Sequence, residues 1–359
     1  MPLPFEASRL VVGYVGNRSD ICTLCRVSKG FQVAAERALY NTLDLRDPAM
    51  TVTVCRMLAS QVRLSTLVEA LTIVAHDDGR SLPPDYWKSV AHALRRAHRL
   101  RFLNIYIDNG LPNAQAWIFR GCTFQISTLH CDLEWDTDLI QFLNRQHALR
   151  DMYILDYNDH VSAGSSETLL QPTSLPQLSV VECTFTEAAN LLVPGRPISH
   201  LKTCLSSAGG DRKRAETALL ISKITESARP LRALDLGDPA ADEQSSLDLL
   251  TRMVNARVVD VRYLGTLALP VDGRQRLVFY SLLRRMPRLD CVELEISHWA
   301  PDPTSDAALR ALAGELRMYC PPVSRVVFVC EFERFFVRIV GGTRYVDEES
   351  GTEMLWREA

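Results

Sequence analysis

The chain has no long apolar run and no excess of positive charge, and both absences exclude classes of protein. No stretch holds the roughly 18 consecutive apolar residues of a membrane-spanning helix, so we expect no membrane association. Its 40 basic residues against 43 acidic ones give a net charge of −3. A nucleic-acid-binding protein normally carries a basic surface, so we expect no nucleic-acid partner. The first residues lack the basic and apolar regions of a secretory signal peptide, which favours a cytoplasmic or nuclear protein.

Motifs that carry catalytic chemistry are also missing from the sequence. It contains no P-loop, no Gly-x-Gly-x-x-Gly, no His-Glu-x-x-His and no Gly-x-Ser-x-Gly. Its ten cysteines are scattered, and Cys22-x-x-Cys25 lacks the second pair of ligands that a structural zinc site needs. We interpret these two cysteines as core-packing residues. We therefore expect no catalytic residue, no metal and no cofactor.

Residues 1–45 predict three short amphipathic helices. Leu10, Val11, Tyr14 and Val15 recur at helical spacing, and a turn follows at residues 16–19. A second helix follows this turn, and a third is predicted over about residues 32–39. Helices of this size bury too little surface to form a large core by themselves. We therefore expect some of their apolar side chains to remain available to a partner.

This N-terminal segment resembles the F-box family. The resemblance rests on Leu3-Pro4-Phe5-Glu6, Val11, Tyr14-Val15, Asp20-Ile21, Leu24 and Val27-Ser28-Lys29-Gly30-Phe31, while Ala7 and Arg26 depart from the family pattern. F-box segments dock onto the Skp-type adaptor of a cullin–RING ubiquitin ligase, and the rest of such proteins holds a protein substrate. The resemblance implies that the following residues contact the adaptor: Leu3, Pro4, Glu6, Val11, Tyr14, Leu24, Val27 and Phe31.

One apolar pattern, apolar-x-x-apolar-x-apolar, recurs along residues 46–359 and first appears just before them. Its copies start at Tyr40, Val68, Leu100, Ile126, Leu149, Leu175, Leu231, Leu289 and Val323, with weaker copies at Ile198 and Ala256. Successive starts are 23 to 34 residues apart, which overlaps the period of leucine-rich repeats, about 20–29 residues. Helical patterns lie between the copies, for example around residues 85–94. Each repeat is therefore predicted to be a strand followed by a helix.

The repeat is degenerate, because only the copy at Leu175 keeps the Asn or Cys expected eight residues later, at Cys183. We predict an α/β fold in which a three-helix F-box (residues 1–45) precedes an irregular leucine-rich-repeat-like solenoid (residues 46–359). Such solenoids resemble those of the expanded F-box family of basidiomycete fungi. Residues 323–350 predict paired strands that cap the repeats.

Two charged clusters have simpler interpretations than a binding site. Asp211-Arg212-Lys213-Arg214 follows two glycines, and we interpret it as a solvated loop. Asp132, Glu134 and Asp136 would share one face of a strand. They are a candidate contact site for a basic substrate, but we favour the simpler interpretation, a solvated rim.

Two functions remain open at this point. The first is the substrate-recognition subunit of a Skp–cullin–F-box ubiquitin ligase, which binds a Skp-type adaptor, and a cullin through it, and presents an unknown protein substrate. The second is a repeat-based interaction scaffold with no ligase role.

Overall fold

The computed structural model describes residues 4–75, 82–107, 115–155, 170–207, 210–238, 242–340, 343–347 and 351–359. The chain forms two compact units, unit 1 (Met1–Pro176) and unit 2 (Gln177–Ala359). Both contain strand–helix repeats, and residue 45, the predicted domain boundary, lies in unit 1 at the end of the first strand. Among the described residues, no helix has both the length and the apolar character needed to cross a membrane.

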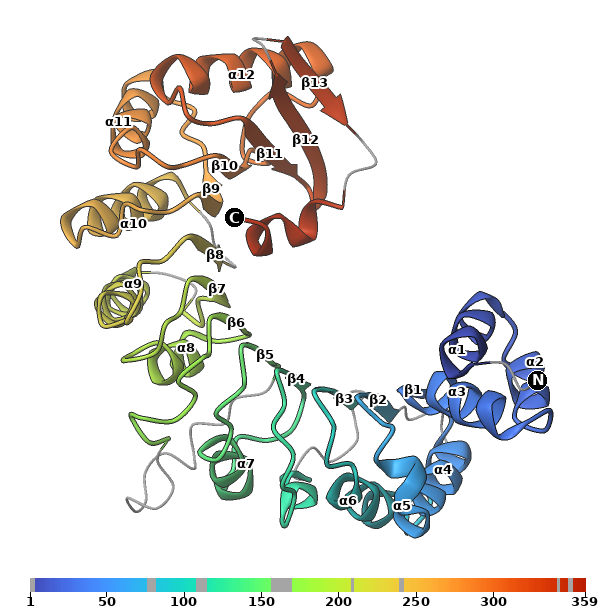
Figure 1. The fold of residues 1–359 in the computed structure, drawn as a ribbon. Coiled ribbons are helices and arrows are strands. Elements are labelled where there is room, and N and C mark those ends of the chain that lie inside the picture. Colours follow the sequence, from blue (N-terminus) through green and yellow to red (C-terminus); the bar gives the residue numbers. More distant parts are fainter. Residues whose placement is uncertain are drawn as a thin grey trace. The chain divides into compact units, whose positions relative to one another are not determined.

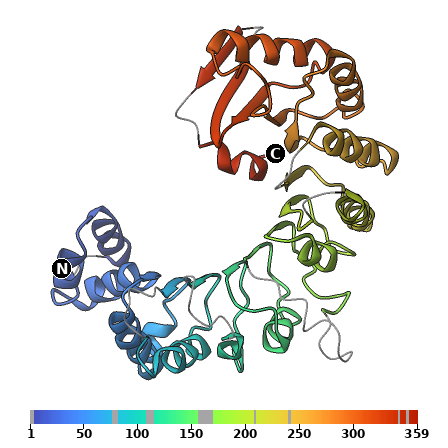
Figure 2. The same ribbon diagram turned by 180° about the vertical axis from the view of Figure 1, so that it is seen from behind.

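Unit 1 begins with the three predicted helices, which gather beside its first strand (Figure 1, Figure 2). They are α1 (Phe5–Tyr14), α2 (Arg18–Leu24) and α3 (Lys29–Tyr40). The rest of unit 1 alternates strands with helices. Its elements are β1 (Thr42–Leu45), α4 (Pro48–Ser60), α5 (Val62–Ser65), β2 (Ala70–Ala75), α6 (Tyr86–Arg96), β3 (Phe102–Ile107), η1 (Ala116–Phe119), β4 (Thr128–Cys131), α7 (Thr137–Leu143) and β5 (Asp151–Ile154).

The five strands of unit 1 pair in chain order, and every pairing is parallel. Helices α4 to α7 lie on one side of this sheet (Figure 1). The central apolar residue of each predicted pattern falls in register with the next, and together these residues form a buried ladder because alternate strand residues face the helices. The ladder consists of Leu43, Leu71, Leu103, Leu129 and Met152.

Unit 2 repeats the same arrangement with longer helices. Its repeat elements are β6 (Val180–Cys183), α8 (Thr186–Leu192), β7 (His200–Cys204), α9 (Gly210–Thr225), β8 (Ala233–Gly237), α10 (Glu243–Asn255), β9 (Tyr263–Ala268), α11 (Gly273–Leu283), β10 (Cys291–Glu295), α12 (Asp306–Tyr319) and β11 (Arg325–Cys330). Strands β6 to β11 pair in parallel and in chain order. Their fully buried ladder consists of Val181, Leu201, Leu234, Leu264, Val292 and Val326.

The predicted fold class is confirmed: the chain is an irregular leucine-rich-repeat-like stack of strand–helix units behind three N-terminal helices. Most strands begin two residues after the first residue of the predicted pattern, but the predicted positions of β6 and β9 are wrong. Strand β6 begins at Val180, and β9 begins only at Tyr263, because Val259 and buried Val261, the apolar residues of the copy at Ala256, lie in the preceding connection. Cys183 therefore ends a strand and does not occupy the repeat's turn position.

The predicted paired strands close the sheet of unit 2. Strands β12 (Glu333–Val340) and β13 (Thr343–Asp347) add to β11 in antiparallel order. A final turn of 3₁₀-helix, η4 (Thr352–Arg357), then contacts β7, β8 and β9. It lies on the side of the sheet away from helices α9 to α11 (Figure 1).

Candidate docking surface on the N-terminal helices

Helices α1, α2 and α3 share a small core of their own. Its buried members are Val12, Ile21, Ala34, Ala35 and Leu39. Asn17 caps α2 by accepting a hydrogen bond from the Ser19 N–H (2.9 Å), and Ser28 caps α3 through the Phe31 N–H (3.3 Å). These caps satisfy backbone donors that a helix terminus leaves unpaired.

Much of the apolar surface of these helices faces solvent instead of this core. On α1, Tyr14 is 89% exposed and Leu10 is 64% exposed, with Val11 and Phe5 also exposed. Because α1 turns about 100° per residue, Leu10, Tyr14 and Val11 form one stripe opposite buried Val12. We name these four residues, together with exposed Val27 and Val33, the N-terminal apolar surface: Phe5, Leu10, Val11, Tyr14, Val27 and Val33.

The predicted adaptor-binding residues divide into two groups. Pro4, Glu6, Val11, Tyr14 and Val27 are exposed. Leu24 and Phe31 are half-buried and pack against the three-helix core, so they contribute to the packing beneath the N-terminal apolar surface. Leu3 lies outside the described residues.

The sequence interpretation omitted Phe5, Leu10 and Val33 from the adaptor-binding residues. Leu10 belonged to the apolar stripe, and its spacing from Tyr14 was the available signal. Helical spacing predicts one shared face for Leu10, Val11, Tyr14 and Val15, but Val15 packs against the core while Leu10 and Tyr14 face solvent.

Helix α3 attaches the surface to the sheet of unit 1. The carboxylate of Glu36 pairs with Arg63 from α5, and Arg37 pairs with Glu69 at 3.5 Å. Glu69 also pairs at 3.2 Å with Arg99, which lies three residues before β3. Helices α1 to α3 are therefore anchored to the first repeats by these ion pairs.

The three acidic residues proposed for substrate contact do not share a strand face. Strand β4 ends at Cys131, and residues 132–136 form an irregular connection to α7. Asp132 is only 5% exposed and accepts a hydrogen bond from the Ile107 N–H (3.0 Å). Asp136 caps α7 through the Leu139 N–H (2.9 Å), and burial raises its pKa. Two of these carboxylates thus have structural roles, and Glu134 is half-buried beside them.

The interpretation of Cys22 and Cys25 as core residues is half wrong. Cys22 is exposed, and only Cys25 packs against the three-helix core. Elsewhere, burial raises the pKa of Cys55, Cys131 and Cys183 to about 12, so these thiols stay protonated at neutral pH. In the described part of the chain, no three His, Cys, Asp or Glu residues form a group that could hold a metal ion.

Titratable side chains converge on the sheet of unit 2 under η4. Lys202 lies 3.5 Å from Glu182 and 3.8 Å from Asp235, and the Tyr263 hydroxyl donates to Glu293 (2.9 Å). Burial, followed by the charge of Glu293, raises the pKa of Asp235 to about 6. Trp356 from η4 covers this sheet face and is 1% exposed. The groups thus pair with one another beneath a protein cover.

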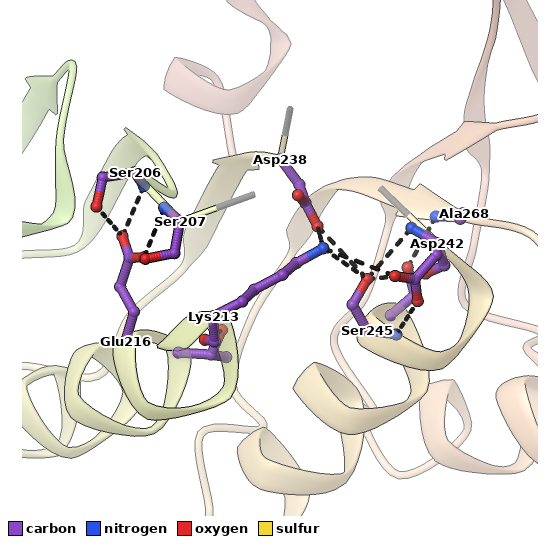
Figure 3. A network of polar contacts seen from close by, with 10 residues as sticks. Ser206, Ser207, Lys213, Glu216, Asp238, Asp242, Ser245 and Ala268 are labelled. Carbon is purple, nitrogen blue, oxygen red and sulfur yellow. Dashed lines mark hydrogen bonds and ion pairs between the residues drawn. The ribbon is translucent and has the colours of Figure 1, made fainter. Parts of the chain in front are cut away.

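A second polar network joins α9 to α10, and it corrects the prediction of a solvated loop at residues 211–214. Figure 3 shows Lys213, which is only 4% exposed, reaching from α9 to Asp238 at 2.5 Å and to the Ser245 hydroxyl at 3.1 Å. Figure 3 also shows Glu216, which accepts bonds from the Ser206 and Ser207 N–H groups at 2.7 and 3.0 Å.

Burial alone would raise the pKa of Glu216. Hydrogen bonds from Thr186, Ser206 and Ser207 outweigh it, and the pKa lies below its usual range. The charged side chains of Lys213 and Glu216 therefore link neighbouring repeats.

Among the comparisons with known proteins, only the solved structures give matches. No protein-family model matches the sequence, and no curated protein matches it. Among solved structures, the chain is similar to the leucine-rich repeat-containing protein LegL7 from Legionella pneumophila. The two share 13% identity over 88% of this chain and 96% of that one, with a TM-score of 0.46.

Proposed function

We propose that the chain is a non-catalytic protein-interaction subunit that binds a Skp-type adaptor through its N-terminal apolar surface. The observation that carries this proposal is the exposure of Leu10, Val11 and Tyr14 on a helix whose core contact, Val12, is already buried. Exposed apolar patches on soluble proteins commonly mark partner interfaces. Val11 and Tyr14 also belong to the F-box resemblance, which supplies the identity of the partner.

In this proposal the strand–helix repeats hold a protein substrate, and the ligase complex supplies the chemistry. The subunit acts by raising the effective concentration of the substrate near the ubiquitin carrier. This role belongs in the cytoplasm or nucleus. The alternative function is a repeat scaffold without a ligase partner. It also uses the repeats for binding, but it names no partner for the N-terminal apolar surface.

A binding experiment with purified full-length protein tests the adaptor contact. We expect the wild type to co-elute with a Skp-type adaptor in size-exclusion chromatography, and Leu10→Asp/Tyr14→Asp to lose co-elution. Central apolar contacts of an interface cost about 2 kcal/mol or more when removed, and an added carboxylate must also be desolvated. The matched control is Met318→Asp, at a residue of α12 that is 74% exposed.

Both variants change exposed residues, so their thermal midpoints should stay near that of the wild type. Retention of the adaptor by Leu10→Asp/Tyr14→Asp would contradict the docking surface. Absence of binding by the wild type would favour the scaffold without a ligase role.

A further inference from the structure

Exposed arginines gather on one edge of unit 2. Three successive helix-to-strand turns, α9–β8, α10–β9 and α11–β10, lie at the edge where the parallel strands begin. We name the exposed arginines of these turns the arginine edge: Arg229, Arg232, Arg257, Arg262, Arg284, Arg285 and Arg288. The whole chain has a net charge of −3, so the positive charge of this edge differs strongly from the charge of the chain as a whole.

Backbone contacts fix the spacing of the arginine edge. The Arg262 N–H donates to the Arg232 carbonyl at 2.6 Å, so these two residues stand on adjacent strand starts. Adjacent strands lie about 4.8 Å apart. Two grooves separate the turns: Arg229 and Arg257 line one, and Arg262, Arg288 and Arg325 line the other.

Few acidic side chains neutralise this edge. Asp260 pairs with Arg288 at 3.6 Å, and Arg325 engages both Asp290 at 2.8 Å and Glu358, which lines the second groove, at 3.6 Å. Within the described ranges, the other six arginines of the edge form no ion pair. The opposite edge of unit 2 carries both signs of charge at or next to the ends of its strands and the starts of its helices: acidic Asp238, Asp242, Glu243, Asp272, Glu295 and Asp306, and basic Arg212, Lys213, Arg214, Arg274 and Arg276.

We propose that the arginine edge binds an acidic segment of a partner protein. The guanidinium group presents paired N–H donors that match a carboxylate in a bidentate geometry, and the edge uses arginine throughout and no lysine. Single-stranded nucleic acid fits less well, because its binding sites combine positive charge with exposed aromatic side chains. In these three turns, all within the described residues, no aromatic side chain is exposed. The edge and the N-terminal apolar surface are separate, so this inference does not depend on adaptor binding.

Fluorescence anisotropy with the full-length chain and a fluorescein-labelled decaglutamate peptide tests the proposal. We expect saturable binding that weakens as salt rises from about 0.05 to about 0.3 M, because screening lengths shorten over that range. Arg232→Glu/Arg262→Glu should weaken binding about tenfold, since two attractions become repulsions of similar size. The matched control, Arg212→Glu/Arg274→Glu, makes the same charge change at exposed residues of the opposite edge and should leave affinity within about twofold.

Three outcomes would overturn the proposal: no saturable binding by the wild type up to about 1 mM peptide, equal losses in both double variants, or tighter binding of a labelled decathymidylate than of the peptide. Circular dichroism checks that each variant is folded. If Arg232→Glu/Arg262→Glu is unfolded, Arg284→Glu/Arg285→Glu changes a different turn of the same edge, and it must show the loss instead.

Discussion

Arg357 and Glu182 stand 175 positions apart in the sequence and form an ion pair of 2.8 Å. The pair joins η4 to β6, whereas the described strands from β6 to β13 pair with their neighbours in chain order. Arg357 also stacks on Trp356, 4.5 Å from the ring centroid. The end of the chain thus returns to the start of unit 2 and covers its sheet.

Removing the Trp356 ring should destabilise the protein substantially. Trp356 is fully buried against Tyr263, Cys291 and Val327. Trp356→Ala leaves a large cavity, and truncating a buried aromatic side chain typically costs about 3–5 kcal/mol. Urea unfolding followed by circular dichroism measures the loss. The control is Met354→Ala in the same turn, where the side chain is exposed and the change should stay within about 0.5 kcal/mol.

Lys213→Ala should also destabilise the fold, through electrostatics. The substitution leaves the largely buried carboxylate of Asp238 without its nearest cation, which lies at 2.5 Å. Removing one partner of a buried ion pair costs about 3–5 kcal/mol. Arg212→Ala, at the exposed neighbouring position, should be nearly neutral in the same urea experiment. Equal free energies of unfolding for the two variants would mean that Lys213 is as dispensable as a surface residue.

Asp235 should make stability depend on pH. Its pKa of about 6 exceeds the unfolded value of about 3.9, so between these values the folded state holds a proton that the unfolded state has lost. The contribution of Asp235 to stability therefore falls as pH rises through this window. The amide in Asp235→Asn cannot ionise, so this variant does not lose that stability as pH rises.

The measurement for Asp235 is the free energy of unfolding of both proteins at pH 4.5 and pH 7.5. We expect the Asn variant to gain on the order of 2 kcal/mol relative to the wild type across this range. A difference that stays constant, or that changes in the opposite direction, would show that Asp235 is ionised throughout.

Asp136 should behave as a helix cap. Asp136→Ala removes the acceptor of the Leu139 N–H and should cost about 1 kcal/mol. Asp136→Ser retains an acceptor at the same position and should recover most of that loss. If serine is as destabilising as alanine in thermal unfolding, the capping bond does not determine the effect.

The strand positions were largely predictable because one physical requirement repeats. Each repeat must bury two or three alternating apolar residues on its helix-facing side, and Leu71, Leu103 and Leu129 show this pattern plainly. The prediction failed where apolar residues continue beyond the strand. At β9, Val259 and buried Val261 precede the strand and imitate its alternating apolar residues.

The site was less predictable because burial depends on residues distant in sequence. The spacing of Leu10, Val11 and Tyr14 indicates a stripe, but only the contacts of Val12 with the other two helices decide which side of α1 is buried. Lysine is rarely buried, so residues 211–214 looked solvated. The partner of Lys213 is Asp238, 25 positions later, and no local pattern connects them. The arginine edge is likewise invisible to net charge, because its residues come from three separate turns.

The position of η4 has a consequence for synthesis of the protein on the ribosome. Strands β6 to β11 can pair one after another as they emerge, since each requires only the preceding strand. Tyr263, Cys291 and Val327 gain their cover only when Trp356 appears, after all the strands from β6 to β13 have been made. Until then the nascent chain leaves these three side chains without their cover, so this is the stage at which a chaperone would find a binding site.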